Sequence, residues 1–266
     1  MTSAAPLALQ GAGLSYGPRT VWSGVDLEVG RGEFLTVLGP NGSGKTSLLQ
    51  TILGLQPLTA GRLSILGRPA HRGSRDVGYV PQQRRIDPVT PIRARDLVRL
   101  GIDGDRWGVG RGGRALRATV DALLDSVGAA AYADVPVGLL SGGEQQRVRI
   151  AQALGTRPAV LLCDEPLLSL DLRHQHEVTA LIDRTRTTTG AAVVFVTHEI
   201  NPVLPYTDRV LYLAPAGHAV GTPDEVLTSD KLTALYGTPV EVVRTRGDRV
   251  LIVGGDEHSH HVEEAS

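Results

Sequence analysis

Gly39-Pro40-Asn41-Gly42-Ser43-Gly44-Lys45-Thr46 is the stretch of this 266-residue sequence that decides the fold. It matches G-x-x-x-x-G-K-[ST], in which glycines let backbone N–H groups converge on phosphate oxygens. An apolar run, Phe34–Leu38, precedes it, and a helical pattern, Ser47–Leu53, follows. The N-terminus of that helix adds partial positive charge. We therefore expect Lys45 to contact the β- and γ-phosphates of a nucleotide and the Thr46 hydroxyl to coordinate Mg²⁺.

Two carboxylates follow another apolar run, Val160–Cys163. A Mg²⁺ ion at a phosphate loop needs a carboxylate at the end of a second buried strand, and Asp164 has that position. The adjacent Glu165 is placed to polarise an attacking water. Seen alone, two such acids could equally be ordinary loop residues, but beside a phosphate loop they predict a nucleotide hydrolase. Cys163 is expected to be a small buried apolar residue.

Apolar runs without alternation indicate the architecture, because strands covered on both faces are typical of a parallel sheet. Such runs lie at Phe34–Leu38, Val160–Cys163, Val193–Val196 and Val210–Leu213. The segments Leu7–Leu9 and Val25–Val29 alternate instead, as half-exposed antiparallel strands do. The predicted fold class is α/β, a P-loop nucleotide hydrolase with a mostly parallel core sheet and an N-terminal antiparallel β subdomain.

The stretch from about residue 84 to residue 156 differs from the rest, because it has helical patterns and no convincing strand. The helical pieces are Pro91–Leu100, Ala115–Val127 and Ser141–Leu154. One of them carries an apolar stripe that ends at Gly128, a candidate for the residue that terminates a helix. We therefore predict a helical subdomain inserted into the α/β core.

Composition narrows the class of protein. The chain has 27 basic and 28 acidic residues, for a net charge of −1, which argues against a protein held on nucleic acid or anionic lipid by its overall charge. A single cysteine excludes a disulfide framework. The apolar runs fall short of the ~18 residues of a membrane span. The N-terminus lacks the pattern of a signal peptide. We expect a soluble protein of a reducing compartment.

Leu140-Ser141-Gly142-Gly143-Glu144 begins a helical pattern. Ser141 and Glu144 have the spacing of a capping box, which explains two residues but not the glycine pair. Glycines at a helix N-terminus form a second anion-binding surface. Here the sequence resembles the ATP-binding cassette family, whose signature motif is LSGGQ, with Glu144 in the last place. The resemblance covers about residues 7–240.

The resemblance implies roles for further residues. Tyr16 has the position of the aromatic ring that stacks on adenine, and Gln82 that of the glutamine near Mg²⁺ and water. Asp171 belongs to the D-loop, where Ser169 replaces the alanine of many relatives. His198 matches the histidine near the γ-phosphate; Glu199 follows it where relatives usually have Asp.

The expected site therefore has three sets of residues. The nucleotide-binding set is Tyr16, Gly39, Pro40, Asn41, Gly42, Ser43, Gly44, Lys45, Thr46, Ser141, Gly142, Gly143, Glu144 and Asp171. The catalytic set is Glu165, His198 and Gln82. The set for the Mg²⁺ of MgATP is Thr46, Gln82 and Asp164.

The resemblance also implies a mechanism and partners. In this family each ATP lies between the phosphate loop of one subunit and the signature motif of the other, so two chains form a head-to-tail homodimer. We expect ATP hydrolysis at the cytoplasmic face of the cell membrane, coupled to integral membrane permease subunits and, through them, to an extracytoplasmic metal-binding protein. No nucleic-acid partner is expected. The nucleotide-binding domain spans residues 7–240, and residues 241–266 form a C-terminal hairpin and a tail.

The substrate is expected to be a divalent metal ion: zinc, manganese or iron. Residues 80–101 are similar to the manganese/zinc/iron importer branch, with Val80-Pro81-Gln82, an acid, and the turn Pro88-Val89-Thr90. Arg93 and Arg95 in this stretch are expected to face the permease. The alternatives are an importer ATPase for a siderophore, cobalamin or another substrate, and a soluble cassette ATPase acting on DNA or the ribosome. The last class usually shows two cassettes, a long coiled-coil insertion, zinc-binding cysteines or a basic surface.

The C-terminal end is expected to form a hairpin of strands 240–244 and 249–253, which turns at residues 246–248. The tail that follows, residues 256–266, contains three histidines and four carboxylates. Imidazole and carboxylate suit divalent metals. The tail is either a metal-binding segment or a solvated polar terminus.

Overall fold

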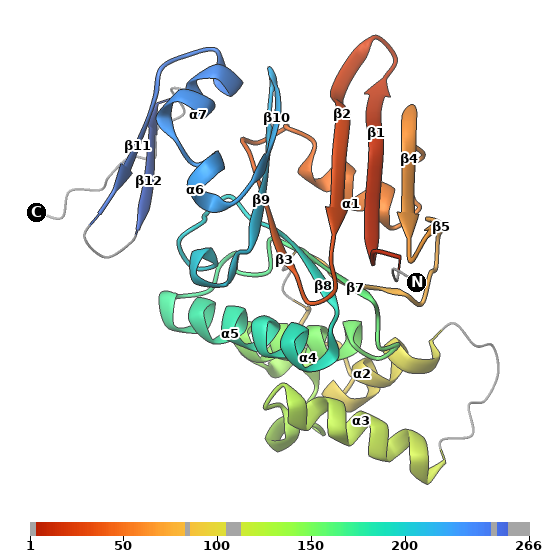
Figure 1. The fold of residues 1–266 in the computed structure, drawn as a ribbon. Coiled ribbons are helices and arrows are strands. Elements are labelled where there is room, and N and C mark those ends of the chain that lie inside the picture. Colours follow the sequence, from red (N-terminus) through yellow and green to blue (C-terminus); the bar gives the residue numbers. More distant parts are fainter. Residues whose placement is uncertain (1–3, 83–85, 105–112, 246–248, 255–266) are drawn as a thin grey trace, which may run out of the picture.

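Two β-sheets, a group of helices and a C-terminal hairpin make up the chain (Figure 1). The structure, a computed structural model, describes residues 4–82, 86–104, 113–245 and 249–254. Residues 83–85, where the expected helical insertion begins, the turn of the hairpin (246–248) and the histidine-containing tail lie outside the described residues. Among the residues that are described, no helix combines the length and the apolarity needed to cross a bilayer.

The central sheet has six strands in the order β10-β9-β3-β8-β7-β6. Five run parallel: β3 (Phe34–Leu38), β6 (Val77–Val80), β7 (Val160–Asp164), β8 (Ala192–Val196) and β9 (Arg209–Ala214). The edge strand β10 (Gly217–Gly221) pairs antiparallel with β9. Every residue of β3, β7 and β8 is buried. The predicted α/β class with a mostly parallel sheet is confirmed.

The second sheet is antiparallel, in the order β2-β1-β4-β5, and its strands include the predicted N-terminal ones. They are β1 (Leu7–Tyr16), β2 (Arg19–Val29), β4 (Ala60–Ile65) and β5 (Arg68–Pro69). The first two strands extend well beyond the predicted ranges. Register shifts between Leu9 and Ala12 and between Ala12 and Leu14 break the alternation of buried and exposed residues. The alternation of buried and exposed residues with a period of two therefore covers only part of each of these two strands.

Helices cover both faces of the central sheet (Figure 1). Helix α1 (Lys45–Ile52) lies between the two sheets, where Leu48, Leu49 and Ile52 pack with strand residues of both. Helix α5 (Leu172–Thr189) covers the opposite face and belongs to a separate apolar cluster. The loop that begins α1 therefore sits between the central sheet and the antiparallel sheet.

Three helices come between β6 and β7, as predicted: α2 (Ala94–Asp103), α3 (Arg114–Ser126) and α4 (Gly142–Ala153), with short 3₁₀ turns at Ala130–Tyr132 and Val137–Leu139. Helix α3 ends at Ser126 with Val127 as its C-cap, and Gly128 follows with φ +70°, the left-handed conformation expected there. Close approach of α2 to α4 requires Gly101, because a Cβ there would lie 2.0 Å from the Gln152 carbonyl oxygen.

The chain ends in a small unit beside β9 and β10 (Figure 1). It contains α6 (Pro223–Val226), α7 (Ser229–Tyr236), β11 (Val240–Arg244) and β12 (Val250–Gly254), and a 3₁₀ turn (Leu204–Tyr206) precedes β9. Strands β11 and β12 pair antiparallel, with Val240 opposite Gly254. Val240 and Val250 are buried against the rest of the chain and thereby attach the hairpin to it.

Candidate functional site

Segments far apart in the sequence meet at the carboxyl ends of the parallel strands. Gly39 follows β3, Gln82 follows β6, Asp164 ends β7 and His198 follows β8. Ligands of open parallel sheets bind at this edge, because loops from neighbouring strands converge there. The sheet order β3-β8-β7-β6 therefore brings together the glycine loop and the carboxylates predicted from the sequence.

The glycine loop, residues 39–44, has a backbone that only glycine fits at two positions. Gly39 has φ +146°, and a Cβ there would lie 2.1 Å from the Leu213 carbonyl oxygen. Gly44 caps the N-terminus of α1 with φ +94°, and its Cβ would lie 2.4 Å from Val21 Cγ1. The β1–β2 hairpin thus packs directly on the loop.

Lys45 has its side chain folded into the loop. Its Nζ donates hydrogen bonds to the carbonyl oxygens of Gly39, at 2.6 Å, and Pro40, at 2.9 Å. The residue is only 7% exposed. Burial lowers the pKa of Lys45, although the nearby Glu165 and Asp164 carboxylates oppose that shift. The ammonium is therefore a buried point charge at the centre of the loop.

The loop also has spare hydrogen-bonding capacity. The Ser43 hydroxyl is buried and has no hydrogen-bond partner among the described residues. A buried donor without an acceptor is costly, so the geometry favours an added acceptor at this point. Phosphate oxygens provide acceptors of this kind, and the residues present fit such a group. Thr46, on the first turn of α1 directly after the loop, is exposed.

Asp164 is a buried carboxylate, 6% exposed, at the end of β7. Its Oδ2 accepts a hydrogen bond from the Tyr79 hydroxyl at 3.1 Å. Burial raises the pKa of Asp164 above its ordinary value; the Tyr79 hydrogen bond and Lys45 act against the rise, and Glu165 adds to it. A cation at this carboxylate would offset the cost of burying its charge. Sequence reasoning missed Tyr79, since only the pairing of β6 with β7 brings it to Asp164.

The Glu165 carboxylate lies next to Gln82 and His198, the other two residues predicted to be catalytic. Gln82 Nε2 donates to its Oε2 at 3.1 Å, and His198 Nδ1 lies 3.8 Å from its Oε1. The backbone of Glu165 has φ +44°, and its N–H donates to the Val196 carbonyl oxygen. A non-glycine residue in this conformation is strained, and strain of this kind collects at functional sites.

The predicted signature segment begins α4. Ser141 caps the helix, and its N–H and hydroxyl both donate to Glu144 Oε2, each at 2.8 Å. The capping-box interpretation of these two residues is therefore correct as local structure. It leaves open the binding role expected from the glycine pair.

Asp171 caps α5 close to this segment. It accepts hydrogen bonds from the His174 backbone N–H at 2.9 Å and interacts with His174 Nδ1 at 2.8 Å. These hydrogen bonds lower the pKa of Asp171. The His174 ring in turn packs on Gly143, where a Cβ would lie 2.7 Å from its Cδ2. His174 was not predicted from the sequence; the Asp-x-x-His spacing after the D-loop was its only signal.

The structure does not bring every predicted residue to the glycine loop. The signature segment is the part that lies away from the loop. The loop begins α1 and the signature segment begins α4, and these two helices belong to separate apolar clusters on opposite faces of the central sheet (Figure 1). Tyr16 lies at the end of β1, 47% exposed, on the hairpin that covers the loop. Its ring is therefore accessible to a ligand.

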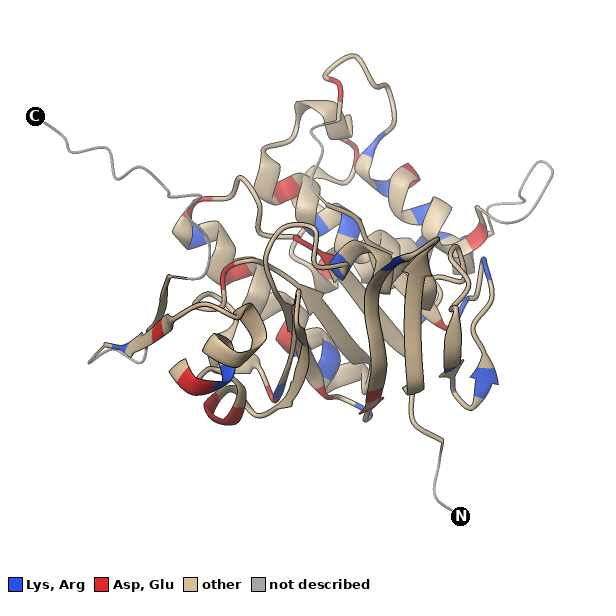
Figure 2. Cartoon of the chain, turned by 90° about the horizontal axis from the view of Figure 1, so that it is seen from above, with Lys and Arg blue, Asp and Glu red and all other residues tan. Residues whose placement is uncertain are grey.

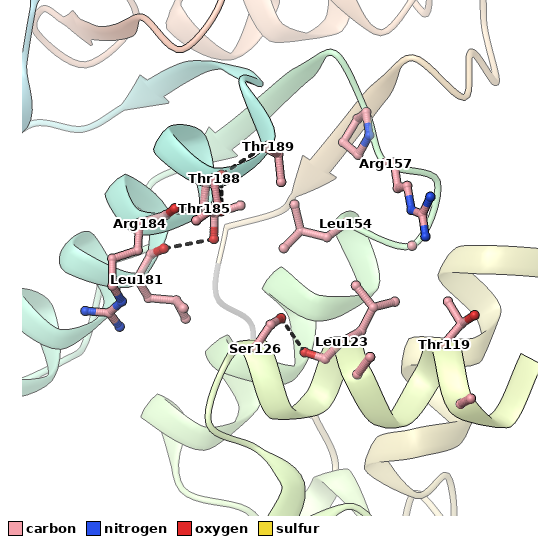
Figure 3. Close-up of a pocket in the computed structure, with 14 residues that line it drawn as sticks. Thr119, Leu123, Ser126, Leu154, Arg157, Leu181, Arg184, Thr185, Thr188 and Thr189 are labelled. Carbon is pink, nitrogen blue, oxygen red and sulfur yellow. Dashed lines mark hydrogen bonds between the residues drawn. The ribbon is translucent and has the colours of Figure 1, made fainter.

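A large cavity lies elsewhere, between α3 and α5 (Figure 3). Its volume is about 770 Å³. Thr185 and Thr189 on its wall already donate to backbone carbonyl oxygens of their own helix. None of the 14 residues lining it is a carboxylate. It lacks the features of the strand-end site.

Charges of both signs are interspersed over the helices and loops (Figure 2), in agreement with the net charge of −1. Within the described ranges there is no group of three or more His, Cys, Asp and Glu side chains that could hold a metal ion. A cation at Thr46 and Asp164 would therefore need further ligands, and phosphate oxygens are suitable ones.

Known proteins resemble the chain over most of its length. The family model described as ABC transporter matches residues 22–168. The zinc import ATP-binding protein ZnuC of Cereibacter sphaeroides is 38% identical over 217 residues, 82% of each chain. That of Roseobacter denitrificans is 37% identical over 231 residues, 86% of this chain and 84% of the relative. An ABC transporter solved in an inward-facing conformation superposes with a TM-score of 0.80 at 25% identity, covering 94% of this chain and 98% of the other.

Proposed function

The chain belongs to the ABC transporter family, and from that premise we propose that it hydrolyses ATP at the strand-end site to drive import of a divalent metal ion. It is an ATP-binding ATPase by family membership. The observation that carries the site assignment is the convergence of the glycine loop, Asp164, Glu165, Gln82 and His198 at one edge of the sheet.

In the proposed site, residues 39–46 hold the triphosphate. Lys45 exchanges the carbonyl oxygens of Gly39 and Pro40 for anionic phosphate oxygens, which are stronger acceptors. The Thr46 hydroxyl, Asp164 and Gln82 would hold Mg²⁺. When bound, Mg²⁺ neutralises charge on the β- and γ-phosphates. The Tyr79 hydrogen bond fixes the orientation of the Asp164 carboxylate for this purpose.

Glu165 acts as the general base. Its carboxylate accepts a proton from water as the water oxygen bonds to the γ-phosphorus, and the bond from that phosphorus to the β–γ bridging oxygen breaks. Gln82 and His198 orient the carboxylate from its two oxygens. His198 also faces the γ-phosphate. Positioning and charge stabilisation supply most of the rate enhancement in phosphoryl transfer.

A second chain completes the site. Ser141, Gly142, Gly143 and Glu144 lie on the far face of the sheet from α1, so we propose that they contact the nucleotide of a partner chain in a head-to-tail homodimer. Asp171 caps α5 beside this segment and contributes to the same interface. Tyr16, on the hairpin over the loop, stacks on the adenine ring.

The proposed partners are integral membrane permease subunits, which place the chain at the cytoplasmic face of the cell membrane, and an extracytoplasmic metal-binding protein that delivers the ion. Zinc is the first candidate, because relatives that cover most of the chain are named zinc import ATP-binding proteins. Manganese and iron are the other candidates from the sequence.

The test is growth of a strain that lacks this chain, under chelation, with zinc, manganese or iron restored singly and cellular metal measured. If a large excess of one metal restores both growth and the cellular content of that metal, the result supports import of that metal. Expression of the Lys45→Ala variant should fail to complement, and expression of Lys231→Ala, the only other lysine, should succeed. Unchanged cellular metal in the deletion strain would refute metal import.

A further inference from the structure

In the signature segment, the donors of Ser141 are already bound by a carboxylate of the same segment, that of Glu144. A single oxygen, Glu144 Oε2, accepts both the N–H and the hydroxyl of Ser141, each at 2.8 Å. The Glu144 N–H donates back to Ser141 Oγ at 3.4 Å. The N-terminus of α4 is thus occupied by a carboxylate of the same chain, which is the kind of group that a helix N-terminus attracts.

In the part of the chain that the structure describes, the charge of Glu144 has no ion-pair partner. Among the described residues, no Lys, Arg or His nitrogen lies within 4.0 Å of its carboxylate. Arg147, three residues along the same helix, is engaged elsewhere: it pairs with Glu177 at 2.9 Å and donates to the Val127 carbonyl oxygen at 3.0 Å. Within the described ranges, the carboxylate is therefore offset by the partial charge of the helix end and by no ion pair.

These contacts put Glu144 in competition with a phosphate. A γ-phosphate that hydrogen-bonds to the Ser141 hydroxyl would have to displace the Glu144 carboxylate from it. The negative charge of the phosphate would then lie close to that carboxylate. Like charges at such distances repel, and little salt penetrates a closed interface to screen them. A glutamine would make the same cap without that charge, because its amide oxygen also accepts from the Ser141 N–H.

We propose that Glu144 is an internal competitor of the γ-phosphate, which weakens ATP-driven association of two chains and so favours reopening of the dimer. The proposal rests on the head-to-tail dimer of the proposed function. Glu144 acts here as a positioning residue, through Ser141.

The chain offers a matched control. Helix α6 begins with the same capping box, in which Thr222 caps the helix and Glu225 Oε2 accepts from the Thr222 N–H at 2.8 Å. This pair lies in the C-terminal unit and not at the signature segment. Replacing Glu225 by Gln therefore makes the same chemical change in the same local structure away from the proposed nucleotide contact.

The experiment measures the monomer–dimer dissociation constant by sedimentation in MgATP, in a Glu165→Gln background that holds the nucleotide unhydrolysed. Adding Glu144→Gln should tighten the dimer about tenfold, because two contacts of about threefold each multiply. The gain should change little as salt is raised, because little salt reaches a closed interface. Adding Glu225→Gln should leave the dissociation constant unchanged. Melting temperatures without nucleotide should agree among the variants.

A dissociation constant that is unchanged or weaker with Glu144→Gln, while melting is normal, would overturn the competition. An equal gain from Glu225→Gln would do the same, since the effect would then be one of net charge. If the Glu165→Gln variant binds ATP yet no variant forms a dimer, the head-to-tail dimer itself is wrong, and the competition falls with it.

Discussion

Gln82 donates a hydrogen bond from its side-chain amide to the Glu165 carboxylate, with 3.1 Å between Nε2 and Oε2. The two residues follow neighbouring strands, β6 and β7, and Gln82 leads into the segment that ends in α2. A movement of the helical group would therefore act on the orientation of the carboxylate. The other carboxylate oxygen faces His198 at 3.8 Å. Glu165 is thus positioned from both sides by residues of different loops.

Glu165→Gln should lower ATP turnover by about 10²–10⁴-fold, the usual effect of removing a positioned base. ATP binding should persist, since Gln keeps the shape of the side chain and an oxygen for Gln82. Phosphate release and equilibrium dialysis with labelled ATP measure the two effects. Glu241→Gln, on the exposed side of β11, is the control and should keep full turnover. Near-normal hydrolysis by Glu165→Gln would exclude it as the base.

Lys45→Ala should abolish hydrolysis and weaken ATP binding by at least about tenfold, because the buried ammonium is the only charge inside the loop. Lys45→Arg should fail too. A planar guanidinium does not fit the space in which Nζ reaches two carbonyl oxygens at 2.6 and 2.9 Å. Nucleotide affinity by calorimetry and turnover check both variants, with Lys231→Ala as the control. Activity of the arginine variant would show that charge alone is sufficient.

The buried strands were predictable because burial on both faces leaves a continuous apolar run. Strands β3, β7 and β8 agree with their predicted ranges to within about a residue at either end. Strand β4 was not predicted: its first three residues are exposed, and it reads Ala60-Gly-Arg-Leu-Ser-Ile65. Its place comes from pairing with β1, and that long-range contact leaves no local periodic signal.

The residues of the candidate site likewise include some that the sequence predicts and some that it does not. The glycine loop, the acids and His198 carry motifs at fixed positions, so their meeting could be expected before the structure was known. Tyr79 and His174 carry no motif of their own. Tyr79 reaches Asp164 only through the register of β6 on β7, and His174 reaches Gly143 only through the packing of α5 against α4. Neither relationship can be deduced from spacing along the chain.

Asp164→Asn should stabilise the nucleotide-free chain at neutral pH while it abolishes hydrolysis. The folded pKa of Asp164 is raised, so between its ordinary value of about 3.9 and the folded value the folded chain binds a proton that the unfolded chain does not. The free energy of unfolding therefore falls as pH rises through that window. Asparagine removes this cost and still accepts from Tyr79.

The measurement is thermal or urea unfolding of both proteins at several pH values, without nucleotide. Asp164→Asn should melt higher above the window, by roughly 2–4 °C for each kcal/mol removed, and the difference should vanish below about pH 4. Tyr79→Phe is the companion variant: it leaves the carboxylate without its hydrogen bond and should lower stability at pH 8. A lower melting point for Asp164→Asn at pH 8 would show that attraction to Lys45 outweighs burial.

Arg93 and Arg95, both expected from the sequence to face the permease, differ in the structure. Arg95 contacts both carboxylate oxygens of Asp134: Nε forms an ion pair with Oδ1 at 2.7 Å, and Nη2 donates a hydrogen bond to Oδ2 at 3.0 Å. It also lies 3.7 Å from Asp121 of α3. The Arg93 side chain is 58% exposed and lies 3.6 Å from Asp134. Arg95 therefore joins α2 to its neighbours, and Arg93 remains accessible to a partner.

Arg93→Glu should consequently reduce metal accumulation in cells and leave basal ATPase activity and melting temperature near those of the wild type, because an exposed ion pair contributes only about 0–1 kcal/mol. Arg95→Glu should lower the melting temperature, since it puts a carboxylate against two others. Melting, ATPase activity of the purified chain and cellular metal content separate the two effects. Arg62→Glu, on the exposed part of β4, is the control for charge reversal. Loss of ATPase activity in proportion to transport in Arg93→Glu would contradict a permease contact there, because a residue that acts only through the permease has no reason to slow hydrolysis by the isolated chain.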